Sequence, residues 1–431
     1  MFYFFKILIN IKLNNFVIFI IKNFLIRKQN STNKKKKTIN ILFLTIEKFR
    51  NDHEILSREG SINSLYISEV WLNIFFKIYY GKKKIERVME KSYSVNPPNF
   101  YLKKRDRYQN FLDKLIKSLL NEYKLDFIVS ADVRYYSNVD WGIVAEKNNI
   151  KWIVFHRENL YASKNIYDRV KKRHMNWEYF PGSKIFVHNK ITKQMFMESK
   201  FIRDKKKIKV LGCMRMDDLH KKVKHYGSSI PKKIITLFSF QPKSLRFPKS
   251  VFYKTHQMVV LFAKNNPEID VVIKPKIEIT KKTDWNDVFY QSIKDLSLEL
   301  KSIKNLSISP FADPHELIMK SLFTIGLNSS VVLESAITGI PVLIPYFKEM
   351  RTKEYKNKIY FRDYFDCFDT PRTAEEFMRV MNLRLKQRKI SEKIQKRRLE
   401  IFEKYMGKFD SFITQRYISE LNLLKLKVNE F

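Results

Sequence analysis

Short apolar runs alternate with amphipathic segments along most of the chain. Five runs in the first half have the length of buried strands, at 39–46, 127–129, 152–155, 184–187 and 208–211. Five more follow at 234–238, 271–273, 306–309, 322–325 and 342–344. Helical segments separate several of them, at 108–123, 139–147, 251–265, 287–302, 313–320 and 329–338. Strands that alternate with helices predict parallel sheets covered by helices.

Two such series predict two α/β domains. The 431 residues exceed one ordinary core, and the polar segment 221–233, which contains Gly and Pro, has the composition of a linker. We therefore expect one Rossmann-like domain at 38–220 and a second at 230–370. Beyond these, residues 371–431 are highly charged and are expected to be helical.

The first 27 residues are strongly apolar and carry spaced basic residues, among them Lys6, Lys12 and Lys22. No uncharged run approaches the roughly 18–20 residues that span a bilayer, and no small-residue cleavage site follows. We interpret residues 1–30 as a basic amphipathic helix lying on an anionic membrane surface. Two alternatives are an ordinary helix packed on the protein and a tilted anchor that spans the membrane. The basic run 34–37 then belongs to a solvated linker.

Composition limits the classes of protein that fit the chain. A formal net charge of +39 suits a nucleic-acid-binding protein or a protein at an anionic membrane. The abundance of Lys, Ile, Asn and Phe with only 9 Gly indicates that codon bias explains much of the Lys excess. The two cysteines exclude a disulfide framework and a Cys-rich metal site. A cytoplasmic protein, peripheral on the inner face of the cytoplasmic membrane, fits these features.

The segment 313–345 carries the clearest chemical signal. It is expected to form a helix, a buried strand, a polar turn at Asn328, Ser329 and Ser330, a short helix and a second strand. Either serine can cap the short helix, whose free N–H groups would then face a phosphate. Glu334 lies one helical turn after Ser330, where its carboxylate can reach a sugar hydroxyl.

Further candidates follow other strands of the second domain. Ser239, Gln241 and Lys243 come after the run at 234–238, and Lys274 ends the run at 271–273. Ligands of open sheets bind at the carboxyl ends of strands, and a lysine there can offset the charge of a departing phosphate. The simpler interpretation of both lysines is that they are surface residues.

Candidates for a general base lie in the first domain. His156 and Glu158 follow the run at 152–155, and Asp132 follows the run at 127–129. An imidazole or a carboxylate at these strand ends can deprotonate a substrate hydroxyl. The simpler interpretation of His156 is a strand-end histidine bonded to backbone.

Motifs for metals and for nucleotide hydrolysis are missing from the sequence. There is no HExxH or clustered Cys/His spacing and no GxxxxGK[ST] loop. We expect no bound metal and no cofactor.

The segment SLFTIGLNSSVVLESAITGIPVLIP resembles the C-terminal half of GT-B glycosyltransferases, especially bacterial capsule and surface polysaccharide enzymes. The matching residues are Gly326, Asn328, Ser329, Ser330, Glu334, Gly339, Pro341 and Val342. Three weaker matches are KIFVHNKITKQMF with IKVLGCMRMDD, ITLFSFQP and VVIKPK, so that the resemblance covers about 120–350. It implies two Rossmann-like domains that face a cleft. The second domain would hold a nucleotide-sugar donor and the first would hold the acceptor of the sugar. The reaction would need no bound metal. The glycine-rich loops of other GT-B members are missing here.

The favoured hypothesis is a membrane-associated glycosyltransferase acting on a surface polysaccharide or a lipid-linked glycan. One rival is a glycerol- or ribitol-phosphate transferase of teichoic-acid type, which would need histidines poised for phosphoryl transfer. Another is a nucleotide-sugar epimerase, against which the N-terminal segment argues. A nucleic-acid-binding protein would interleave aromatic residues with lysines in one patch, whereas the charge here is spread along helices and linkers, so that no nucleic-acid partner is expected.

Overall fold

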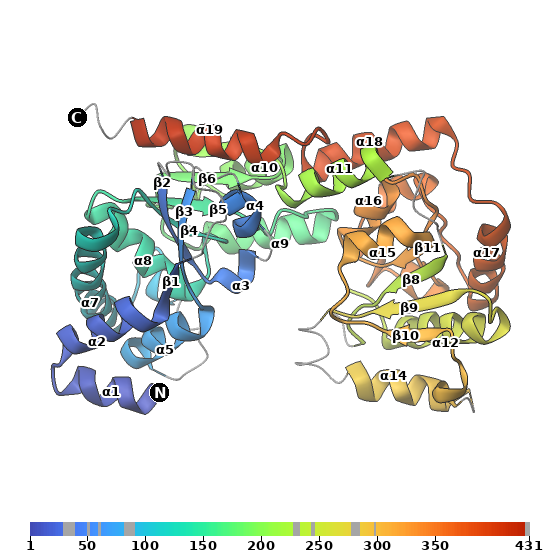
Figure 1. The fold of residues 1–431 in the computed structure, drawn as a ribbon, viewed down its shortest axis with the longest axis horizontal. Helices are drawn as coiled ribbons and strands as arrows, with labels where there is room; N and C mark the ends of the chain where they lie inside the picture. The colour runs from blue at the N-terminus through green and yellow to red at the C-terminus, as the bar shows by residue number, and fades with distance from the viewer. Residues whose placement is uncertain are drawn as a thin grey trace. The chain divides into compact units, whose positions relative to one another are not determined.

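The computed structural model describes residues 1–28, 39–49, 52–58, 62–81, 91–226, 233–242, 246–276, 285–296 and 299–426. These residues form two compact units (Figure 1). The first, called the N-terminal unit, comprises 1–159, 169–217 and 406–431, and the second, called the C-terminal unit, comprises 160–168 and 218–405. The expected helical region at 371–431 is therefore divided between the two units.

A seven-stranded sheet forms the centre of the N-terminal unit. Its order is β1-β3-β2-β4-β5-β6-β7, with every neighbouring pair parallel except β1 and β3. The strands are β1 (Ile26–Lys28), β2 (Ile39–Leu44), β3 (Ile62–Ile67), β4 (Phe127–Ser130), β5 (Lys151–Phe155), β6 (Lys184–Val187) and β7 (Ile208–Val210). The sequence pattern predicted five of them and missed β1 and β3.

Helices accompany this sheet along the chain. They are α3 (Ile46–Phe49), α4 (Asp52–Arg58), α5 (Glu69–Tyr80), α7 (Asn99–Tyr123), α8 (Tyr136–Lys147), the greater part of α9 (Lys164–Met175) and α10 (Lys190–Glu198). The next helix, α11 (Arg215–Tyr226), belongs to the C-terminal unit from residue 218 onward. The long helix α7 buries one side, which includes Leu112, Leu115 and Leu119, and exposes Lys and Asn on the other. This periodicity is that of a helix with one side packed in the core, here against α5 and α8.

A five-stranded parallel sheet forms the centre of the C-terminal unit. Its order is β10-β9-β8-β11-β12, the doubly wound arrangement of Rossmann-like domains. The strands are β8 (Ile234–Phe238), β9 (Asp270–Lys274), β10 (Leu306–Ile308), β11 (Ser321–Gly326) and β12 (Val342–Leu343). All five expected runs are strands, so the predicted fold class of two Rossmann-like domains is confirmed.

The helices of the C-terminal unit are α12 (Lys249–Asn265), α14 (Trp285–Lys294), α15 (Pro314–Lys320), α16 (Val331–Ala336), α17 (Ala374–Lys386) and α18 (Glu392–Met406). One of them, α15, begins at a signal that the sequence shows clearly. The side chain of Asp313 accepts a hydrogen bond from the N–H of Glu316, and Pro314 occupies the first helical position of α15. Such a cap and proline are typical of a helix start, because neither leaves an internal donor unpaired.

The expectation of one helix over residues 1–30 is wrong. The segment forms α1 (Phe2–Asn10), α2 (Asn14–Ile20), a π-helical turn (Ile21–Leu25) and β1, while residues 29–38 lie outside the described residues. The chain turns between α1 and α2 because Lys12 has a left-handed backbone with φ of 61°. Among the described residues, the structure has no helix of the length and apolarity required to cross a membrane.

The last helix, α19 (Ile413–Leu426), belongs to the N-terminal unit. Its start is held by the buried carboxylate of Asp217, which accepts the N–H of Ile413 at 3.1 Å and of Thr414 at 2.7 Å. The Thr414 hydroxyl donates to the same carboxylate at 2.7 Å. Asp217 therefore caps a helix far away in sequence, which explains its place in the matched segment without any role in chemistry.

We expect Gly407→Ala to destabilise the N-terminal unit by about 2–4 kcal/mol, from left-handed strain plus overpacking. Gly407 has a φ of 92°, and a Cβ there would lie 2.4 Å from the Cα of Gly212. The matched control is Gly339→Ala, where φ is 81° but nothing lies within 4 Å of the new Cβ. Urea unfolding should show a loss of only about 1 kcal/mol for the control. Equal losses would mean that the close approach does not matter.

Candidate functional site

The order of the second sheet places two predicted motifs together. The chain runs from β8 to β9 and β10 on one side, then crosses to β11 and β12 on the other. Phe238, the last residue of β8, is in register with Gly326, the last residue of β11. Ser239 and Asn328 therefore follow adjacent strands at the carboxyl edge. This is the topological switch point where open α/β sheets bind ligands.

The polar turn after β11 is joined to a neighbouring loop by Asn328. Its backbone is left-handed with φ of 49°, its side-chain oxygen accepts the N–H of Tyr360 at 2.8 Å, and its amide donates to the Lys358 carbonyl at 3.3 Å. The guanidinium of Arg246 lies 5.2 Å from the centre of the Tyr360 ring. The segments after β8, after β11 and around 358–360 thus meet at one place, and a cation lies there.

The prediction that a serine side chain caps α16 is wrong. Ser330 is the N-cap residue, but its φ of −63° and ψ of −25° are helical and its side chain makes no capping hydrogen bond. A capping side chain reaches the N–H groups of the first turn from an extended backbone, and a helical backbone turns it away. Ser329 and Ser330 are half-buried in this turn.

Glu334 is buried, with 2% of its surface exposed. One carboxylate oxygen lies 3.1 Å from Nε2 of His315, which comes from the first turn of α15. Glu334 therefore lies within the unit against a second helix rather than on an open surface. His315 was not among the predicted site residues, because only the packing of α15 on α16 brings it to Glu334.

Ser239 is held in a buried network. Nδ1 of His256 lies 2.8 Å from the Phe252 carbonyl and must donate to it, so Nε2 is left as an acceptor for the Ser239 hydroxyl at 2.8 Å. The same hydroxyl accepts the indole N–H of Trp285 at 2.9 Å. The Ser239 side chain is thereby engaged inside the unit.

The other three candidates of the second domain differ in placement. Gln241 is exposed close to the end of β8. Lys243 lies outside the described residues. The ammonium of Lys274 donates to the Pro310 carbonyl at 2.9 Å and so holds the loop that leads into α15.

In the N-terminal unit, two rival candidates for the base lie beside each other. Asp132 follows β4 and His156 follows β5, and Oδ2 of Asp132 lies 3.6 Å from Nδ1 of His156. The other oxygen of Asp132 accepts the backbone N–H of Arg134 at 2.7 Å. Burial lowers the pKa of His156, against the opposing effect of Asp132 and Glu158. The imidazole is therefore neutral near pH 7, the form that accepts a proton. Glu158 itself is exposed.

Asn159, which was not among the predicted residues, fixes the backbone at His156. The side-chain oxygen of Asn159 accepts the N–H of His188 at 3.0 Å, and its amide donates to the His156 carbonyl. Arg157 lies 3.5 Å from Asp52, across the same unit. These contacts depend on tertiary structure, and no local pattern in the sequence indicates them.

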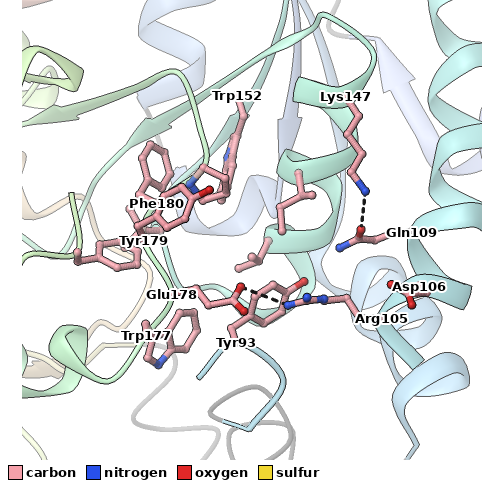
Figure 2. A pocket seen from close by; sticks show the side chains of 15 residues that line it. Tyr93, Arg105, Asp106, Gln109, Lys147, Trp152, Trp177, Glu178, Tyr179 and Phe180 are labelled. Atoms are coloured by element: carbon pink, nitrogen blue, oxygen red, sulfur yellow. Dashed lines mark hydrogen bonds and ion pairs between the residues drawn. The ribbon is translucent and has the colours of Figure 1, made fainter. Parts of the chain in front are cut away.

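A separate cavity of about 270 Å³ lies in the N-terminal unit (Figure 2). Tyr93 stacks on Trp177 with ring centres 6.1 Å apart, and Arg105 lies 3.3 Å from Glu178. Residues of α7, of α8 and of the loop before β6 line much of the cavity, and none of the predicted site residues is among them. The predicted site and this cavity are therefore different places.

Metal ligands are not clustered in the part of the chain that the structure describes. Within those ranges, no group of three or more His, Cys, Asp and Glu residues is arranged to hold an ion.

The whole chain has a GT-B fold, with solved structures that align over nearly its full length. A putative UDP-N-acetylglucosamine 2-epimerase from Listeria monocytogenes aligns with a TM-score of 0.53 and 13% identity, covering 91% of this chain and 98% of that one. The S. aureus MnaA–UDP structure aligns with a TM-score of 0.50 and 13% identity, covering 92% and 98%. At such identity the likeness concerns the fold alone. No protein-family model and no curated protein sequence matches the chain.

We expect the C-terminal unit to lose stability as the pH falls from about 6.5 to 4, in part through His256. Burial lowers the pKa of His256 to about 4. The unfolded chain binds a proton below about 6.5 that the folded chain does not accept until about pH 4. His256→Gln removes this ionisation, so the difference in unfolding free energy between wild type and variant should shrink with falling pH. A constant difference across pH 7.5 to 4.5 would contradict the assignment.

Proposed function

We propose that the protein is a glycosyltransferase that moves a sugar from a nucleotide-activated donor to a glycan or lipid-linked glycan. The observation that supports this most is the polar turn Asn328-Ser329-Ser330 at the switch point of the second sheet. Its half-buried hydroxyls and the neighbouring Arg246 suit a phosphate-bearing ligand. A site of this chemistry in a GT-B fold fits a nucleotide-sugar donor, and UDP is the nucleotide named in the structures that align.

Glu334 is proposed to bind the ribose of the donor nucleotide. A carboxylate accepts two hydroxyl hydrogen bonds from a ribose, and His315 holds one of its oxygens in place. Because Glu334 is nearly buried, a hydroxyl that reaches it displaces little water. A charged hydrogen bond in such surroundings contributes about 1.5–3 kcal/mol.

The proposed chemistry is attack of an acceptor hydroxyl on the anomeric carbon. The acceptor oxygen forms the new glycosidic bond, the bond to the nucleotide phosphate breaks, and the hydroxyl proton passes to His156. Asp132, 3.6 Å away, stabilises the imidazolium that forms. The departing phosphate takes the electron pair and is stabilised by Arg246 and the hydroxyls of the polar turn. We place this reaction in the assembly of a surface polysaccharide such as a capsule, at the inner face of the cytoplasmic membrane.

A second candidate is epimerisation of a nucleotide-sugar. The alignment with a putative UDP-N-acetylglucosamine 2-epimerase at a TM-score of 0.53 favours it. The two candidates share the donor site and differ in the need for an acceptor. Incubation with UDP-N-acetylglucosamine alone separates them, because an epimerase changes the sugar and a transferase requires an added glycan.

We expect Glu334→Gln to weaken nucleotide-sugar binding by about 1.5–3 kcal/mol while the unit stays folded, because it removes a charged acceptor. Titration calorimetry measures the affinity. The control is Glu316→Gln on the neighbouring helix α15, where the side chain is about half exposed and pairs with Lys222. An unchanged affinity in Glu334→Gln would remove this residue from the donor site.

Both Ser329→Ala and Ser330→Ala should reduce donor binding. Because neither hydroxyl caps α16, the thermal stability without ligand should stay within about 0.5 kcal/mol of wild type. Normal binding by both variants would place the phosphate elsewhere at this edge, with the loop after β8 as the first choice.

His156→Ala should lower turnover by about 10²–10⁴-fold with donor binding intact. Asp132→Asn should lower it less, since Asp132 acts through His156. The exposed His225 provides the control substitution His225→Ala, which should leave turnover unchanged. A larger loss in Asp132→Asn than in His156→Ala would transfer the role of base to Asp132.

A further inference from the structure

The first 24 residues expose an unusual amount of apolar surface. Nine of the 23 exposed large apolar side chains among the described residues lie in this short segment. On α1, α2 and the turns beside them, the exposed fractions are 67% for Tyr3, 59% for Ile7, 58% for Ile11, 49% for Phe16, 53% for Phe19 and 66% for Phe24. Exposed large apolar side chains concentrated in one short segment indicate a binding face. We call these six side chains the outer face.

The same segment is docked on the N-terminal unit by its other side. Phe5 is fully buried, with its ring centre 6.2 Å from that of Trp71 and 5.0 Å from that of Phe75 on α5. Val17 and Ile21 are also fully buried. Lys22 lies 2.8 Å from Glu122 at the end of α7. Figure 1 shows α1 and α2 beside α5 and α7, as their contacts require. The outer face is therefore a fixed part of a folded unit.

Charge identifies the occupant of the outer face. Residues 1–28 contain no acidic residue, and Lys6, Lys12, Arg27 and Lys28 are all exposed. Two copies of this face brought together would oppose like charges at close range. An anionic bilayer instead offers acyl chains to the aromatic side chains and phosphates to the lysines.

We infer that α1 and α2 form a preformed monotopic membrane-binding hairpin, which inserts its outer face into one leaflet of an anionic bilayer while its inner side stays docked. Helices of nine and seven residues are about 14 and 10 Å long, so they lie within the interfacial layer of one leaflet. The proposed function already places the protein at a membrane, and this inference assigns the contact to particular residues. It also fixes the N-terminal unit against the lipid surface, where a lipid-linked acceptor would be presented.

Vesicle sedimentation of the full chain tests the assignment without donor or acceptor. The variant is the triple substitution Phe16→Ser, Phe19→Ser and Phe24→Ser, which changes only exposed side chains. Its partition onto vesicles of phosphatidylglycerol and phosphatidylcholine should fall at least tenfold. The control is Phe311→Ser in the C-terminal unit, where the side chain is 77% exposed, and its partition should match wild type. Wild-type binding that the triple variant retains would overturn the inference.

A depth measurement shows whether the outer face enters the acyl region. Cys213 and Cys367 are both buried, so a fluorophore attached at Phe19→Cys labels the hairpin selectively. Brominated acyl chains should quench this label several-fold more than one at Phe311→Cys. Equal quenching would overturn the inference. So would a dimer of the wild type that does not bind vesicles and that the triple substitution dissociates, because the outer face would then cover a second copy.

Because no nucleotide-sugar enters either experiment, these results are independent of the donor site. Vesicle binding without donor binding would refute the proposed function and leave the hairpin assignment standing. Donor binding without vesicle binding would refute the hairpin assignment and leave the donor site standing.

Discussion

Parallel pairing of β8 with β11 is the constraint on which the candidate donor site depends. The two strands are more than 80 residues apart in sequence, yet Phe238 and Gly326 end them in register. A parallel sheet in this order must place both carboxyl ends at the same edge, and it leaves a crevice where the chain changes direction. The residues after Gly326 then face the residues after Phe238, whatever their identity. Side-chain chemistry decides only what that crevice binds.

Buried polar pairs fix the groups around the crevice. His315 holds Glu334 across two helices, and Asn328 holds the loop at Tyr360. Polar groups out of contact with water are destabilising unless they are hydrogen-bonded, so each pair resists rearrangement. In the N-terminal unit, the buried side chain of Asn159 likewise bonds the His156 carbonyl and the His188 N–H. Preorganisation of this kind is what a binding site requires, because ordering its groups during binding would cost free energy.

The sequence predicted much of the fold for a clear physical reason. Strands buried on both faces, such as β4 and β11, are short runs of apolar residues that stand out against helices and linkers. The pattern missed β3, whose sequence INSLYI interrupts its apolar residues with Asn and Ser. The break between α1 and α2 at Lys12 was also missed, because the residue type does not indicate that this lysine has a left-handed backbone.

Candidate site residues were predicted less evenly. Those that follow strands, such as Asp132 and His156, were found because the carboxyl edge of a sheet is readable from the strand runs. The contact between His315 and Glu334 was missed, because it depends on how α15 packs against α16. The prediction of a serine cap was wrong because the backbone angles of Ser330 cannot be derived from its residue type.

We propose above all that the C-terminal unit binds a nucleotide-activated sugar. A thermal-shift screen of the full chain against UDP-, GDP-, CMP-, CDP- and dTDP-linked sugars tests it most directly. A ligand that binds only the folded chain stabilises it by about 2.7 kcal/mol at a hundredfold excess over Kd. We expect a clear upward shift of the unfolding temperature with donors of one nucleotide and little shift with the others. No shift with any donor, at concentrations up to several millimolar, would contradict it.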